Sequence, residues 1–104
     1  MNPLIEDRRE QIAAICRQHG VRRLDVFGSA LRVDFDEACS DVDVVIEFEA
    51  QAPGNALRRY FDVKAKLEAV LNRPVDIVML DAMDDTRLKR IIERTKVPVY
   101  AAAA

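Results

Sequence analysis

The 104-residue sequence has little cysteine and histidine, the residues that build disulfide frameworks and thiol- or imidazole-based metal sites. Its two cysteines, Cys16 and Cys39, form neither a CxxC motif nor a metal-ligand spacing, so we interpret them as free thiols in a reducing compartment. The single histidine, His19, precedes Gly20, and we assign both residues to a helix end rather than to a ligand or a base. These scarcities argue against a disulfide scaffold and against a Cys- or His-based metal centre.

The sequence also lacks a charge excess and a long apolar run. Lys and Arg number 16 against 18 Asp and Glu, giving a net charge of −2, which argues against a general nucleic-acid binder. No apolar run approaches the ~20 residues of a membrane span, and no signal peptide precedes the first expected helix, so we expect a cytoplasmic protein. The phosphate-binding signatures GxxxxGK[ST] and GxGxxG are both absent, which argues against P-loop and dinucleotide sites.

Length and hydrophobic patterning predict one domain over residues 1–100, followed by an alanine tail, 101–104, that we exclude from the fold. The patterns predict helices over 2–19 and 55–71, strands over 21–27, 41–48 and 75–80, a last helix capped by Asp81 or Asp84, and an extended edge segment over 97–100. This order predicts an α/β (α+β) domain, with a small mixed sheet of three to four strands flanked by helices on one face.

Two aspartates follow each other on one face of the second expected strand. Asp41 and Asp43 are two residues apart, so their Cα atoms would lie ~6.6 Å apart with both carboxylates on the same side. Like charges repel in that position unless a cation lies between them, and Mg²⁺ prefers such oxygen ligands. Asp76 interrupts the otherwise apolar third strand, and it joins the pair if that strand lies beside the second.

Weaker interpretations exist for each acidic motif. A lone Asp-x-Asp pair is commonly a surface feature, and Asp76 alone could pair with an arginine. Asp34 and Asp36 repeat the spacing in an irregular segment, 33–40, which we interpret as a solvated loop. That segment does not match a calcium loop, because Ala38 and Cys39 stand where a glycine and an oxygen ligand belong. The three aspartates on two strands together favour a metal site.

A short polar segment after the first strand supplies groups suited to phosphate. Gly28 allows close approach to the backbone, and Ser29 begins an expected helical turn whose N–H groups favour anions. Arg32 lies three residues further on, and its guanidinium group can add charged hydrogen bonds to a phosphate. Taken alone, this motif is equally compatible with a simple turn and an N-cap. Next to two metal-binding carboxylates, it forms a coherent site for a Mg²⁺-nucleoside triphosphate.

In this order, the features resemble a minimal nucleotidyltransferase (MNT) domain of the DNA polymerase beta-like nucleotidyltransferase superfamily. The resemblance rests on Gly28-Ser29, Arg32, the Ser40-Asp41-Val42-Asp43 segment and the sequence RPVDIV around Asp76, and it covers residues 21–100. It implies that Asp41, Asp43 and Asp76 are the catalytic carboxylates that bind two Mg²⁺ ions. It further implies that Gly28, Ser29, Arg32 and Ser40 bind the nucleotide, with ATP as the substrate.

The resemblance also implies a partner. Small members of this family are often antitoxins paired with an all-helical HEPN ribonuclease toxin, and some transfer AMP from ATP to a tyrosine of that toxin. Three functions therefore remain open: transfer of AMP to a partner protein, neutralisation of a toxin by binding alone, and nucleotidyl transfer to a small molecule. We rank the third last, because a chain of this length would need to dimerise to enclose a small acceptor. The oligomeric state, a homodimer or a hetero-oligomer with the partner, stays open as well.

Overall fold

The computed structural model describes residues 3–28, 41–49, 55–80, 84 and 86–102. The chain forms helices and strands in the order α1 (Pro3–Asp7), α2 (Arg9–Gln18), β1 (Val21–Phe27), β2 (Val42–Phe48), α3 (Ala56–Leu71), β3 (Val75–Val78), α4 (Arg87–Thr95) and β4 (Val97–Ala101). The order matches the one that the sequence predicts. Several sequence predictions fall outside the described residues: the helical turn that begins at Ser29, the loop at 33–40 and the Asp81 cap.

The strands form one mixed sheet in the order β3-β2-β1-β4. β1 runs antiparallel to both β2 and β4, whereas β2 and β3 are parallel. A parallel pair needs a long crossover connection, and α3 is that connection between β2 and β3. The predicted mixed α+β sheet of up to four strands is confirmed, and Val97–Ala101 is the predicted edge strand, where Pro98 is tolerated.

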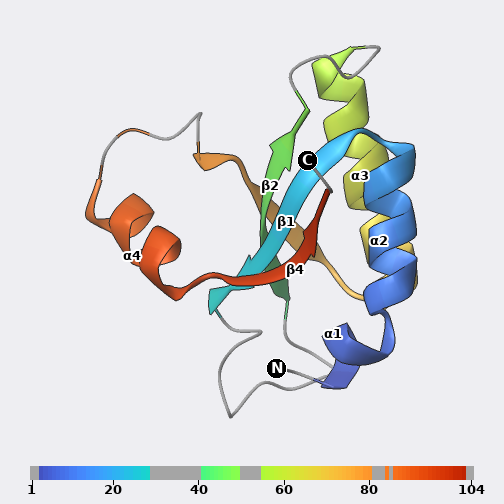
Figure 1. Ribbon diagram of the computed structural model, residues 1–104, viewed down its shortest axis with the longest axis horizontal. Coiled ribbons are helices and arrows are strands. Elements are labelled where there is room, and N and C mark those ends of the chain that lie inside the picture. The colour runs from blue at the N-terminus through green and yellow to red at the C-terminus, as the bar shows by residue number, and fades with distance from the viewer. Residues whose placement is uncertain (1–2, 29–40, 50–54, 81–83, 85, 103–104) are drawn as a thin grey trace.

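The main core lies between one face of the sheet and the helices α2 and α3 (Figure 1). Its buried side chains follow the alternation of the strands and the apolar stripes of the helices. They include Ile12, Ile15, Cys16, Leu24, Val26, Val42, Val44, Ile46, Val63, Leu67, Leu71 and Val75. Figure 1 shows α4 on the other side of the sheet, so the expectation that all helices share one face was wrong. Ile92 of α4 is buried but does not belong to the main cluster, which agrees with this placement.

Local side-chain chemistry explains where the long helix α3 begins and ends. The Asn55 side chain accepts hydrogen bonds from the backbone N–H groups of Leu57, at 2.8 Å, and Arg58, at 3.2 Å, as an N-cap does. At the other end Asn72 adopts a left-handed conformation with φ 54°, and its N–H donates to the Glu68 carbonyl. The predicted end of this helix at residue 71 is therefore confirmed.

The last helix begins later than the acidic residues before it suggested. Thr86 is the N-cap of α4, because its side chain accepts a hydrogen bond from the Lys89 N–H at 3.2 Å. Asp84 lies two residues earlier and is exposed, so the expectation that it caps this helix was wrong. Of the three large apolar side chains of α4, Leu88 and Ile91 are 58% and 37% exposed, and Ile92 is buried.

The remaining differences are small. The predicted first helix is divided at Arg8, whose Nε donates to the Val70 carbonyl at 2.9 Å and so ties this point to α3. β3 ends at Val78, two residues earlier than expected, and β4 continues to Ala101, the first residue of the alanine tail. Leu57 and Phe61 of α3 are 65% and 56% exposed, although their spacing matched the apolar stripe. Within the described residues, the helices are too short and too polar for any of them to cross a bilayer.

Candidate active site

The parallel pairing of β2 with β3 places two of the predicted aspartates next to each other. Asp43 and Asp76 are direct partners in the register, as are their neighbours Val42 and Val75. Both valines are fully buried in the main core, so the alternation of each strand turns the aspartates to the opposite face. Asp43 is half-buried and Asp76 is exposed on the edge strand. Asp41 is exposed and lies one residue before β2.

Contacts from the long helix fix the start of β3 and hence the position of Asp76. The Glu68 Oε2 atom accepts a hydrogen bond from the Val75 N–H at 3.0 Å, and the Pro74 carbonyl accepts one from the Val42 N–H at 3.1 Å. These two bonds hold Val42 and Val75, the residues directly before Asp43 and Asp76. Sequence reasoning did not identify Glu68, because nothing in the helical pattern distinguishes it from a solvent-exposed glutamate.

The end of β1 contacts the Asp43 carboxylate through Gly28. Phe27 is the register partner of Asp43, and Gly28 follows it with a φ of +64°. A Cβ atom on residue 28 would lie 2.7 Å from the Asp43 Oδ2 atom, which is closer than side-chain atoms tolerate. A side chain at residue 28 would therefore be strained by the left-handed backbone, and it would displace the Asp43 carboxylate. The sequence suggested only the general role of a glycine near phosphate.

The side chains of this site fit a hard cation but do not enclose one. Within residues 3–28, 41–49, 55–80, 84 and 86–102, no group of three or more Asp, Glu, His or Cys side chains is gathered tightly enough to hold a metal ion. The paired carboxylates of Asp43 and Asp76 match the one or two carboxylate ligands with which Mg²⁺ is usually bound, the remaining ligands being water and substrate phosphates. The predicted nucleotide contacts Ser29, Arg32 and Ser40 lie outside the described residues.

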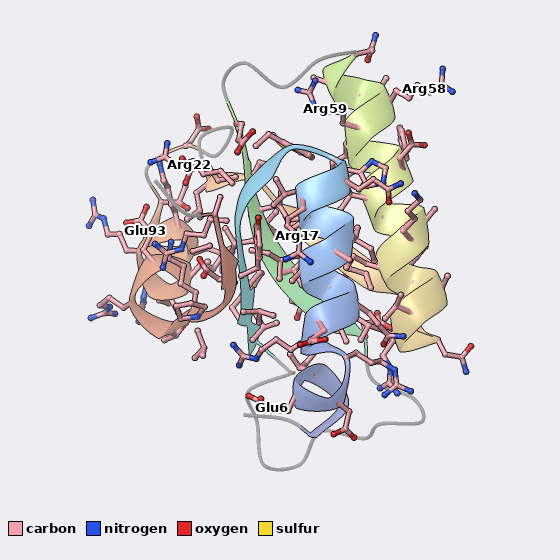
Figure 2. The ribbon with its side chains drawn as sticks, turned by 45° about the vertical axis from the view of Figure 1, so that its right-hand side comes forward. Glu6, Arg17, Arg22, Arg58, Arg59 and Glu93 are labelled. Carbon is pink, nitrogen blue, oxygen red and sulfur yellow. The ribbon has the colours of Figure 1, made fainter. Side chains whose placement is uncertain are left out.

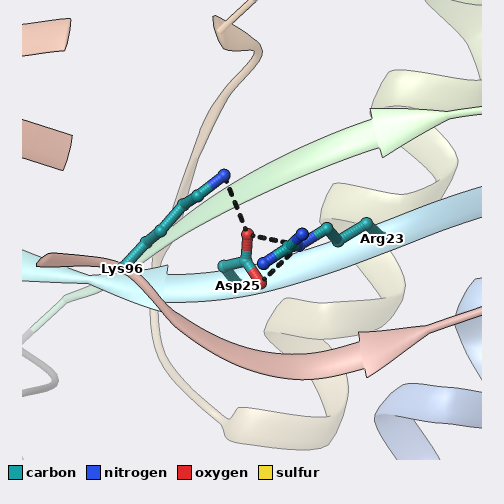
Figure 3. A network of polar contacts seen from close by, with 3 residues as sticks. All are labelled: Arg23, Asp25 and Lys96. Carbon is teal, nitrogen blue, oxygen red and sulfur yellow. Dashed lines mark hydrogen bonds and ion pairs between the residues drawn. The ribbon is translucent and has the colours of Figure 1, made fainter. Parts of the chain in front are cut away.

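A further acidic residue, missed by the sequence reasoning, lies on the same face of the sheet. Asp25 is 1% exposed and is the register partner of Val45, two residues along β2 from Asp43. Its carboxylate accepts hydrogen bonds from the Arg23 Nε atom at 3.0 and 3.1 Å and lies 3.4 Å from the Lys96 ammonium (Figure 3). A buried carboxylate needs such partners, and Lys96 comes from the junction of α4 and β4.

A cavity of about 530 Å³ adjoins this network between α4 and the sheet. Its lining comes from β1, β2, the residues after β3, and α4. Val45 and Asp25 place the cavity on the face that carries Asp43 and Asp76, a short distance further along the strands. Figure 2 shows Glu93, one of the lining residues, on α4 on the far side of the sheet from Arg17 of α2.

Cys16 and His19 have structural roles. Burial raises the pKa of the Cys16 thiol to about 12, so it carries no reactive thiolate at neutral pH. His19 is the C-cap residue of α2, as predicted, and its N–H donates to the Ile15 carbonyl at 3.1 Å. Burial lowers the pKa of His19, and the nearby Lys66 ammonium lowers it further. The raised pKa of the buried Cys16 thiol argues against a role as a nucleophile, and His19 precedes β1, at the opposite end of that strand from Gly28.

Comparisons with known proteins agree with this geometry. The sequence profile of the nucleotidyltransferase domain family matches residues 8–99. The protein adenylyltransferase MntA of Thermococcus cleftensis is 33% identical over 91 residues, which cover 80% of this chain and 88% of that protein. MJ0435 of Methanocaldococcus jannaschii, provisionally named a protein adenylyltransferase, is 32% identical over 88 residues, covering 85% of this chain and 90% of that protein.

Solved structures share the fold. A provisionally assigned minimal nucleotidyltransferase has a TM-score of 0.69 at 32% identity, and the match covers 94% of this chain and 96% of that one. A toxin–antitoxin complex with AMP-PNP has a TM-score of 0.67 at 20% identity, and the match covers 90% of this chain and 73% of that one. The toxin–antitoxin pair MntA–HepT has a TM-score of 0.63 at 19% identity, and the match covers 93% of this chain and 73% of that one. The last two show a common fold alone. The family match, the relatives and the arrangement of the sheet lead to one conclusion: the chain belongs to the nucleotidyltransferase family, as an enzyme of the minimal nucleotidyltransferase type.

Proposed function

We propose that this enzyme transfers the AMP of ATP to a hydroxyl group of a partner protein in a Mg²⁺-dependent reaction. The observation that carries the proposal is the register pairing of Asp43 with Asp76, with the Gly28 backbone against the Asp43 carboxylate. Two carboxylates and a glycine that leaves the backbone accessible are the groups that a metal-bound triphosphate requires. No nucleophilic side chain is needed, because the acceptor hydroxyl attacks the nucleotide directly.

The chemistry assigns a task to each described residue. In this reaction the acceptor oxygen forms a bond to the α-phosphorus, the bond from that phosphorus to pyrophosphate breaks, and the hydroxyl proton is released. When bound, Mg²⁺ ions would neutralise the triphosphate and lower the pKa of the acceptor hydroxyl. Asp43, with Asp41, would hold the triphosphate side of the site, and Gly28 would leave room for it. Asp76, on the accessible edge strand, would face the acceptor and help to remove its proton.

The proposed partner is a HEPN-type toxin. Support comes from two kinds of similarity: one relative is named protein adenylyltransferase MntA, and the fold recurs in crystallised toxin–antitoxin complexes, one of which contains AMP-PNP. On this proposal the chain is the antitoxin, and modification of the toxin is the means of neutralisation. The acceptor site would then be completed by the toxin.

The test is transfer of radiolabelled AMP from ATP to a purified HEPN-type partner in the presence of Mg²⁺. We expect label on the partner with the native chain and none with Asp43→Asn or Asp76→Asn, with the fold retained in both variants. Asp62→Asn is the matched control, because Asp62 is an exposed carboxylate on α3 whose ion-pair partner, Arg58, is at 3.9 Å. Full labelling by either active-site variant would refute the assignment of these carboxylates.

A second function, neutralisation by binding alone, is favoured by the outer surface of α4. Leu88 and Ile91 are exposed there beside Arg87 and Arg94, so the helix offers an apolar strip with a basic border. Such a surface would suit a partner with an acidic, partly apolar face. Neutralisation of the toxin by Asp43→Asn without ATP would support this function, whereas dependence on ATP and on Asp43 would support transfer.

A further inference from the structure

The cavity between α4 and the sheet lies beside the paired aspartates. On the proposed function, the transfer of AMP to a partner protein, this position makes the cavity a candidate binding site for the acceptor. Val45 lines the cavity and is two residues from Asp43 on the same face of β2, a separation of ~6.6 Å along a strand. The cavity extends from β1 across β2 to Met79 and Leu80, the residues that follow β3. A peptide bound in the cavity could therefore extend a side chain along the same face of the sheet to Asp76.

The geometry of the reaction determines which substrate belongs in this cavity. The attacking oxygen and the leaving pyrophosphate lie on opposite sides of the α-phosphorus. Gly28, where the triphosphate is proposed to bind, is at the β1 end of the Asp43–Asp76 row, next to Asp43. Along the strands, Gly28 lies on one side of the Phe27–Asp43 pair, whereas the cavity-lining residues Asp25 and Val45 lie on the other side. In-line attack thus directs the acceptor, and not the leaving group, towards the cavity.

The lining suits a polypeptide rather than a phosphate. Arg23, Lys89 and Lys96 contribute positive charge, and the negative charge is contributed by Asp25, Glu47 and Glu93. These charges cancel, and Asp25 is already paired with two of the cations. A triphosphate would find no excess of positive charge there, whereas the mixture of charged and apolar side chains, Phe48 and Met79 among them, matches a peptide segment with side chains of several kinds.

We propose that this cavity binds the segment of the partner protein that carries the acceptor hydroxyl, and that it determines which hydroxyl is modified. The Asp25 network holds Lys96 at the α4–β4 junction, which keeps α4 over the sheet and the cavity open. Lys89 and Glu93, one turn apart on α4, form the outer rim and contact the residues that flank the acceptor. The acceptor is thus a side chain of a folded protein segment, and free small alcohols are poor substrates.

The test measures cavity occupancy directly and needs no transfer. Leu80→Cys is prepared in a Cys39→Ser background, and the rate of maleimide labelling is followed; Cys16 does not interfere because its thiol is buried with a raised pKa. We expect MgATP alone to leave the rate unchanged. Addition of the HEPN-type partner at ten times its dissociation constant should slow labelling about ten-fold, in proportion to occupancy. Ala14→Cys on α2, on the other face of the sheet, is the matched control.

Two further arms separate the alternatives. In the first arm, the partner residue that receives AMP and its two neighbours are replaced by glycine. This variant should still bind the enzyme but should no longer slow maleimide labelling of Leu80→Cys. In addition, Lys89→Glu should raise KM for the partner about five-fold and leave KM for ATP unchanged. Protection by MgATP alone would overturn the proposal, because the nucleotide would then occupy the cavity. Equal protection by the glycine variant would overturn it too. If no AMP is transferred at all, the protection experiment still decides whether the cavity binds the partner, so the two proposals fail separately.

Discussion

Replacing Gly28 by alanine tests whether the end of β1 controls the position of the Asp43 carboxylate. The added methyl group has two effects. It places a Cβ atom 2.7 Å from the Asp43 Oδ2 atom, and it forces a non-glycine residue to adopt a φ of +64°. The first effect displaces a carboxylate at the proposed metal site, whereas the second only destabilises the fold. The chain contains a control that separates them, because Gly20 at the other end of β1 has a φ of +69°.

The expected magnitudes differ between stability and activity. A left-handed alanine costs about 1–2 kcal/mol, so both Gly28→Ala and Gly20→Ala should lose that much stability. For a domain of this size, each kcal/mol lowers Tm by roughly 4–8 °C. Transfer of AMP should differ much more. A misplacement of a catalytic group by about 1 Å costs on the order of 100-fold in rate, so Gly28→Ala should lose at least that, and Gly20→Ala almost nothing.

The assay is initial-rate transfer of labelled AMP at a temperature where both variants are fully folded by circular dichroism. Asp43→Ala should lose much less activity in the Gly28→Ala background than in the native chain, because the carboxylate is already misplaced there. If Gly28→Ala transferred AMP as fast as Gly20→Ala, the close contact with Asp43 would be irrelevant to the reaction. A stability loss in Gly28→Ala far above that in Gly20→Ala would instead show that the Asp43 side chain cannot move away.

Three further predictions concern stability. Asp25→Ala should lower the free energy of unfolding in urea by about 2–3 kcal/mol. This is less than the loss for a fully buried ion pair, because Lys96 is partly exposed. A loss below about 0.5 kcal/mol would show that the network is dispensable. Asn72→Ala should cost about 1 kcal/mol while Asn72→Gly is near neutral, since residue 72 is left-handed; equal losses would contradict this. The pKa of His19 is lowered in the folded chain, so the unfolded chain binds a proton first as the pH falls through 6.5, and the free energy of unfolding decreases there. His19→Gln should make the dependence of this free energy on pH flatter. An unchanged dependence would refute the assignment.

The strands and the paired aspartates could be predicted because their signals are local. The alternation over 21–27 gave the bounds of β1, and the break at Asn72 gave the end of α3. The proximity of Asp76 to Asp43 was a conditional prediction. It depended on β3 lying beside β2, and their parallel pairing meets that condition. The assignment of these residues to catalysis stays a prediction until the variants are measured.

The burial of individual residues could not be predicted where it depends on distant neighbours. The alternation of β1 places Asp25 on the face away from the main core, which suggests exposure; its burial depends on Lys96, which is distant in sequence. Helical periodicity likewise indicates which side chains of α3 share a face but not how far the neighbouring elements extend. Figure 1 shows the N-terminal end of α3 extending beyond α2, and Leu57 and Phe61 lie on that end and are exposed.

The pairing of β1 with β4 affects how the chain folds during synthesis. β1 is an inner strand, yet its second neighbour, β4, lies far along the chain from it, with Leu24 opposite Tyr100 and Arg23 opposite Ala101. Until the ribosome has released those residues, β1 has one edge of unpaired backbone N–H and C=O groups, which is where strands from other chains can add. Contacts between such distant segments also form slowly. A chain whose synthesis stops before β4 should therefore aggregate or be degraded more readily than one that contains this strand, and the amount of active enzyme in the cell would depend on the synthesis of β4.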